Sequence, residues 1–153
     1  MLTSLLAALL QMATAPAPAA CTAVAPPPAD LAAWRTTDAA ALTIGQPTTL
    51  TLTPAAATAF AITPDRAPAP GSFGGVVPLT VTTYGTYRVA LSAGAWIDLI
   101  DPAKTSLKSV AHTEGPACSG IRKIVDFTLA PGRYTLQLSS AKAASIRVLV
   151  APR

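Results

Sequence analysis

The amino-acid sequence predicts an all-β fold, an antiparallel β-sandwich or jelly roll of about eight to nine short strands. Short runs of alternating apolar and polar residues recur at intervals of about ten residues. Proline and glycine, with 15 and 9 copies in 153 residues, separate these runs, and no long segment has the apolar spacing of a helix. A chain of this length has room for one hydrophobic core and therefore for one domain.

Residues 1–20 are expected to form a signal peptide. Residues 2–15 are apolar and uncharged, but too few to span a bilayer, and small residues follow them. Ala17 and Ala19 supply the A-x-A pattern of a cleavage site, which places cleavage after Ala19 or Ala20. No cationic residue precedes the apolar run, and a buried N-terminal helix is the alternative. The signal interpretation predicts a periplasmic or secreted protein without a transmembrane anchor once the signal is removed.

Residues 21–47 are expected to be a Pro/Ala-rich tether with one short helical turn. The turn is predicted at 30–34, with Asp30 as its N-cap and Trp34 packing on the body of the domain. A second short turn is possible at 38–42.

Residues 48–153 are expected to form the β-sandwich domain. The proline- and glycine-rich stretch 64–75 is predicted to be a long loop, either a surface segment or the rim of a binding site that includes Phe73. Pro131 and Gly132 favour a tight hairpin turn. The predicted strands are 48–53, 58–63, 76–82, 86–91, 95–100, 107–112, 122–129, 133–139 and 145–150.

The two cysteines, Cys21 and Cys118, have three interpretations. In an oxidising compartment they pair in a disulfide, which is the preferred one. Alternatively Cys21, at the predicted mature N-terminus, is lipidated, although Pro18 stands where bacterial lipoproteins usually carry leucine. Both cysteines could also be free thiols.

The positive charge is concentrated in the C-terminal third of the chain. The formal net charge is +4, and residues 100–153 hold eight Lys and Arg residues against three acidic ones. Such a surface attracts anionic partners such as a membrane or a polysaccharide. The cations are spread singly and lack interleaved aromatic residues, so no nucleic acid is expected as a partner.

Trp96 and Asp98 are the first candidates for ligand binding. They are out of phase with the apolar residues Ile97 and Leu99, so they are expected to share the outer face of a strand. An aromatic ring beside a carboxylate suits a sugar or a peptide, whereas burial of Trp96 in a core is the alternative. Arg122 is a further candidate, unless it forms a cross-strand charge pair.

His112 and Glu114 are candidates for a ligand or metal site. They are two residues apart, so on a strand both side chains point to one face, where Asp98 or Asp101 could join them. One imidazole and two carboxylates would suit a divalent metal such as iron, and a surface pair at a strand end is the alternative. Other chemistry has less support, since no G-x-S-x-G motif is present; a Cys118–His112 thiolate pair would require Cys118 to be free.

The hairpin around the Pro131 turn has the pattern F-x-L-x-x-G-x-Y-x-L-x-L, and the residues that match it are Phe127, Leu129, Gly132, Tyr134, Leu136 and Leu138. The stretch 85–91, G-T-Y-R-V-A-L, echoes the same pattern. In this the chain resembles exported bacterial sandwich modules of the prepeptidase C-terminal kind. Such modules are non-catalytic and bind or assist secretion, which is what the resemblance implies here.

Two further stretches are distinctive, G-A-W-I-D-L at 94–99 and A-C-S-G-I-R-K-I-V-D-F at 117–127. Through them the whole chain resembles a group of small exported proteins of Gram-negative bacteria. A homogentisate 1,2-dioxygenase activity is sometimes assigned automatically to members of the group. That enzyme is a much larger cupin whose iron is held by several histidines and a carboxylate, whereas this chain has His112 alone.

Together these observations predict an exported, non-catalytic binding or accessory module without a cofactor. Its ligand is unknown, with a carbohydrate, a peptide or a component of the cell envelope as the classes considered. The alternative is a small metal-dependent jelly-roll enzyme, similar to a dioxygenase and centred on His112.

Overall fold

The computed structural model describes residues 19–153. The expected signal peptide lies outside the described residues except for Ala19 and Ala20, and it stays a prediction. Within the described residues no helix is long and apolar enough to cross a membrane.

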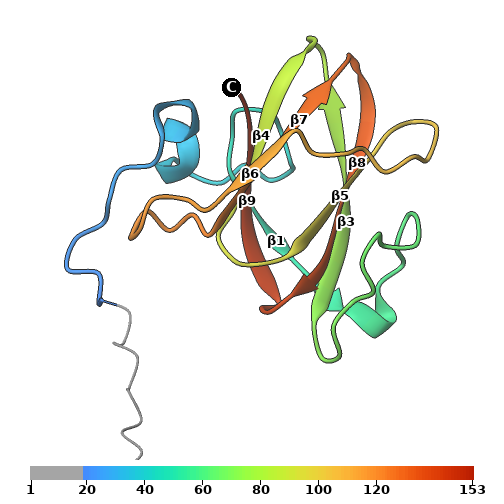
Figure 1. Ribbon diagram of the computed structural model, residues 1–153, viewed down its shortest axis with the longest axis horizontal. Coiled ribbons are helices and arrows are strands. Elements are labelled where there is room, and N and C mark those ends of the chain that lie inside the picture. Colours follow the sequence, from blue (N-terminus) through green and yellow to red (C-terminus); the bar gives the residue numbers. More distant parts are fainter. Residues whose placement is uncertain (1–18) are drawn as a thin grey trace, which may run out of the picture.

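The domain is a β-sandwich of two antiparallel sheets, which confirms the predicted fold class (Figure 1). The five-stranded sheet has the order β1-β9-β4-β7-β6 and the four-stranded sheet the order β2-β3-β8-β5. Strands β5 and β6 are therefore edge strands of different sheets. The strands are β1 (Thr48–Thr51), β2 (Thr53–Pro54), β3 (Phe73–Val81), β4 (Gly85–Leu91), β5 (Trp96–Ile100), β6 (Ala111–Thr113), β7 (Lys123–Leu129), β8 (Gly132–Ala141) and β9 (Ser145–Pro152).

The main core lies between the sheets and follows the period-two pattern of the sequence. On β4, Val89 is fully buried and is paired in register with Val125 of β7. Directly paired residues share a face of the sheet, so the alternation places both side chains in the core. Leu136 of β8 and Val148 of β9 pack into this core from opposite sheets.

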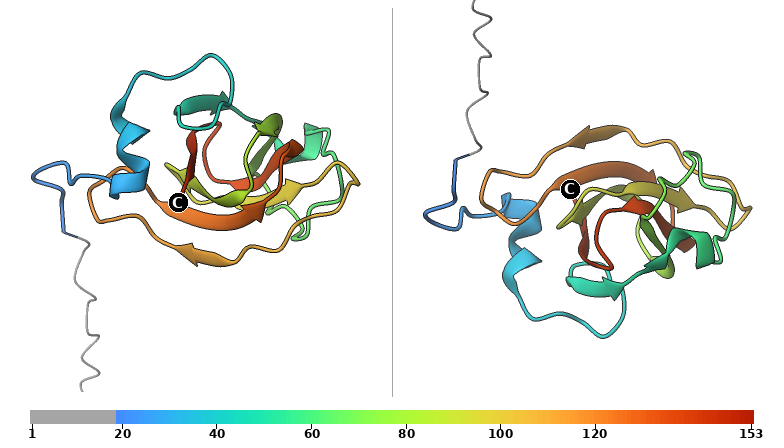
Figure 2. Two further views of the ribbon diagram at one scale, coloured as in Figure 1. Left: turned by 90° about the horizontal axis from the view of Figure 1, so that it is seen from above. Right: turned by 90° about the horizontal axis from the view of Figure 1, so that it is seen from below.

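A second apolar cluster covers the outer face of the five-stranded sheet. The 3₁₀-helix η1 (Ala29–Arg35) packs Leu31 and Trp34 against Ile124 of β7 and Leu149 of β9. Figure 2 shows η1 lying beside the strands, outside the sandwich. The predicted helical turn and the packing of Trp34 are thus confirmed.

The predicted cap of this turn is wrong. The N-cap is Pro28, without a side-chain hydrogen bond, and Asp30 lies inside the first turn. Its carboxylate accepts a hydrogen bond from Arg88 at 2.8 Å. The second turn considered at 38–42 is also absent, because Asp38 instead forms an ion pair with Arg147 of β9 at 2.9 Å.

Three predicted strands differ in the structure. Residues 48–53 divide at the buried Leu52, since β1 pairs with β9 whereas β2 pairs with β3 in the other sheet. Residues 58–63 form no strand, because the backbone N–H groups of Ala61 and Ile62 donate to the side chain of Gln137 instead of a neighbouring strand. In 107–112 only the last two residues belong to β6.

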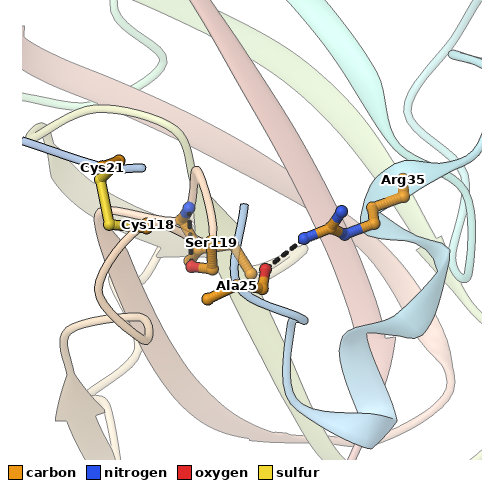
Figure 3. The surroundings of a disulfide bond; sticks show 6 residues. Cys21, Ala25, Arg35, Cys118 and Ser119 are labelled. Atoms are coloured by element: carbon orange, nitrogen blue, oxygen red, sulfur yellow. Dashed lines mark hydrogen bonds between the residues drawn. A yellow bond between two sulfur atoms is a disulfide. The ribbon is translucent and has the colours of Figure 1, made fainter. Parts of the chain in front are cut away.

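The preferred interpretation of the cysteines is confirmed: Cys21 and Cys118 form a disulfide with their Cα atoms 5.6 Å apart. Lipidation of Cys21 and a free Cys118 thiol are therefore ruled out in this structure. Figure 3 shows the bond joining the N-terminal segment to the loop before β7. Two hydrogen bonds support the junction, from Ala25 N–H to the carbonyl of Cys118 and from Arg35 to the carbonyl of Ala25.

Candidate functional site

A pocket of about 420 Å³ lies where the edge strands β5 and β6 approach each other. We call it the edge pocket. Its walls come from β5, β6, β7, the segment before β6 and the loop before β3, and its volume is within the usual range for small-molecule sites. The residues that line it are Asp65, Trp96, Ile97, Leu107, Lys108, Ser109, His112, Lys123, Val125 and Phe127.

The floor of the edge pocket is apolar. It is formed by Val125 and Phe127 of β7, Ile97 of β5 and the partly buried Leu107. Val125 and Phe127 also belong to the main core, so the pocket opens directly onto the interior of the sandwich. Strand β6 has only three residues, so the five-stranded sheet ends here in a short edge strand.

Trp96 and Asp98 share the outer face of β5, as the alternation predicts, but their exposure differs. The Trp96 ring lines the pocket, and its Nε1 donates to Asp98 Oδ1 at 2.7 Å. Asp98 is only 1% exposed. Its second oxygen accepts hydrogen bonds from Gln137 Nε2 at 3.1 Å and from the backbone of Asp65 at 3.4 Å. Asp98 therefore holds the Trp96 ring and the loop that carries Asp65 in place, and its carboxylate is not free to contact a ligand.

Replacing Asp98 by asparagine is expected to lower the free energy of unfolding by about 1 to 3 kcal/mol, because an amide N–H₂ would face the donors of Trp96 or Gln137. Urea denaturation measures the loss, and amide hydrogen exchange should become faster at 61–65. The matched control is Asp101→Asn, since the Asp101 side chain accepts one hydrogen bond, from Thr105 N–H, through Oδ1, which asparagine retains. Equal stability of the two variants would contradict the role given to Asp98.

Two cations lie over the Trp96 ring. The guanidinium carbon of Arg66 and Nζ of Lys123 are 5.7 and 5.6 Å from the ring centroid, within cation–π range. Lys123 also donates to the carbonyl of Ala95 at 2.8 Å. Burial, with a smaller contribution from the charge of Arg66, lowers the pKa of Lys123. Within residues 19–153 no carboxylate forms an ion pair with Lys123 or Arg66.

Of the two neighbouring cations Arg122 and Lys123, only Lys123 lines the edge pocket. Arg122 forms an exposed ion pair with Glu114, whereas Lys123 lines the pocket. The signal for this lies in the alternation, because Lys123 is in phase with the core residues Val125 and Phe127. Lys108 and Asp65, which also line the pocket, come from irregular segments whose sequence carries no such periodic signal.

His112 and Glu114 are not brought together with Asp98. His112 is paired with Val125 and lines the mouth of the pocket, while Glu114 turns to Arg122 after β6 ends. Glycine at position 115 allows the chain after β6 to pass close to Ile121, because a Cβ atom there would overlap the backbone oxygen of Ile121. In the part of the chain that the structure describes, no cluster of three His, Cys, Asp or Glu side chains is placed to hold a metal ion.

Phe73 belongs to β3 rather than to the loop 64–75 that precedes it. It lines a separate, mainly apolar hollow of about 430 Å³ with Pro68 and Pro70. The loop itself is hydrogen-bonded to the four-stranded sheet, for example from Ala69 N–H to Ser140 Oγ at 3.0 Å.

Comparison with known proteins gives no relative from which a role could be transferred: no protein-family model, no curated protein and no solved structure matches the chain.

Proposed function

We propose that this protein is an exported, non-catalytic binding module whose ligand site is the edge pocket. The observation that carries the proposal is the convergence of an apolar floor, the Trp96 ring and the titratable side chains of Lys108, His112 and Lys123 on one pocket. Small-molecule sites combine these features, with apolar walls for affinity and a few polar groups for orientation.

The polar groups of the pocket support binding better than catalysis. Ser109 and His112 both line it, but among the described residues no hydrogen bond joins them and no carboxylate is hydrogen-bonded to the imidazole. A serine nucleophile needs both contacts. The proposal of export is supported by the Cys21–Cys118 disulfide, because disulfides persist in oxidising compartments, and by the predicted signal peptide.

Closing the pocket mouth provides a direct test. Replacing Ser109, which is exposed at the mouth, by tryptophan is expected to abolish fragment binding while the fold is retained. A screen of small apolar and amphipathic fragments by ¹H–¹⁵N NMR should shift the amides of residues 96–97, 107–112 and 123–127 in the wild-type protein. The matched control is Ser145→Trp, because Ser145 is exposed on β9 and outside the pocket.

The proposal fails if the shifted amides lie elsewhere on the domain, or if Ser109→Trp binds fragments as the wild-type protein does. It also fails if protein purified without a polyhistidine tag contains near-stoichiometric iron, zinc or manganese that is lost in His112→Ala. That result would favour the metal-dependent enzyme instead.

A further inference from the structure

We infer that the ligand of the edge pocket is an amphipathic anion, with an apolar chain on the floor formed by Val125 and Phe127 and its charged end beside Lys123 and Lys108. A medium-chain carboxylate is the simplest member of this class. The inference rests on the proposed function and adds the chemistry of the ligand to it.

The charges around the mouth favour an anion. Lys108 and Lys123 line the pocket, and Arg66 lies over the same indole ring as Lys123. Asp65 is the one carboxylate among the lining residues, and it accepts a hydrogen bond from Ser106 Oγ at 2.8 Å. Within the described residues no ion pair involves Lys108, Lys123 or Arg66.

Lys123 is placed to receive the charged end. Its ammonium group has three donors, of which one is used by the carbonyl of Ala95. It lies partly buried beside a second cation, Arg66, and an anion bound there would relieve this repulsion. A charge-assisted hydrogen bond in such a site is also stronger than a neutral one.

The surroundings of Trp96 argue against a sugar as the ligand. Aromatic rings bind sugars through an open face, but Arg66 and Lys123 already lie over this ring. Its N–H group is likewise committed to Asp98. The pocket offers apolar surface at its floor and two lysines, Lys108 and Lys123, against the single carboxylate of Asp65, which matches a chain with an anionic end.

Three probes of equal chain length test the inference: octanoate, octanol and octylammonium, titrated into the full domain at pH 7 and followed by NMR. Octanoate is expected to bind at least tenfold more tightly than either of the other two. Replacing Lys123 by methionine should weaken octanoate binding by about tenfold, as expected for the loss of a charged partner, and should change octanol binding less than twofold.

Lys108→Met provides an independent variant, because Lys108 is exposed and outside the core, so its replacement leaves the core intact. It is expected to weaken octanoate binding severalfold. Lys142→Met, at an exposed lysine outside the pocket, is the matched control and should leave all three affinities unchanged.

The outcomes separate this inference from the proposed function. If octanol or octylammonium binds in the pocket as tightly as octanoate, the pocket is a binding site but the anionic class is wrong. If octanoate binds and neither lysine variant weakens it, the assigned charge partners are wrong. If none of the probes binds and the fragment screen also finds no ligand in the pocket, the proposed function itself is overturned.

Discussion

Replacing both cysteines by serine is expected to lower the free energy of unfolding by about 4 kcal/mol. The Cys21–Cys118 bond links residues 97 positions apart, and a cross-link over a loop of this size removes much of the chain entropy of the unfolded state. Guanidinium denaturation of the variant and of the oxidised wild-type protein measures the difference. The slope of the transition should also rise, because the uncrosslinked chain exposes more surface when it unfolds.

Wild-type protein kept reduced during denaturation is the control, and its transition should coincide with that of the double serine variant. A loss of less than about 1 kcal/mol, with an unchanged slope, would mean that the N-terminal segment is held mainly by η1 and not by the disulfide.

Replacing Arg88 by methionine is expected to cost about 3 to 5 kcal/mol. Its Nε donates to Asp126 Oδ1 at 3.1 Å and its Nη1 to Asp30 at 2.8 Å, on the sheet face that η1 covers. The Asp126 side chain is only 3% exposed, so the variant leaves a buried carboxylate with Arg153 as its remaining partner. Burial acts to lower the pKa of Arg88, but hydrogen bonds and charges from Asp126 and Asp30 outweigh it and raise the pKa.

Arg122→Met is the matched control for this experiment. Arg122 pairs with Glu114 where both side chains are exposed, and exposed ion pairs contribute about 1 kcal/mol or less. Urea denaturation of both variants at pH 7 provides the comparison. Similar losses for Arg88→Met and Arg122→Met would contradict the structural importance assigned to the Asp30–Arg88–Asp126 network.

A strand could be predicted from the sequence where its apolar and polar residues alternate and neighbouring strands also take up its backbone hydrogen bonds. Residues 86–91 alternate, and β4 lies between β7 and β9, so both the local pattern and the sheet favour a strand there. Residues 58–63 alternate as well, but Gln137 takes the backbone donors of Ala61 and Ile62. The competing partner is 75 or more positions away in the sequence, beyond what a local pattern can report.

The candidate site was predictable only in part, for a similar reason. Trp96 and His112 are rare residue types in this chain, and both line the edge pocket. Lys123 was detectable from its phase with Val125, whereas Lys108 lies in an irregular segment. The pocket itself arises because edge strands of two sheets meet, which depends on strand order and not on any one stretch of sequence.

The most direct test of the central claim is an isotope-filtered NOE experiment on ¹³C-labelled protein with unlabelled octanoate. We expect contacts from the terminal methyl group of octanoate to side-chain protons of Val125 and Phe127, and contacts from the methylene next to the carboxylate to the side chain of Lys123. Contacts at another surface, such as the exposed Tyr84, would contradict the account, as would the absence of any contact with the pocket at saturating octanoate.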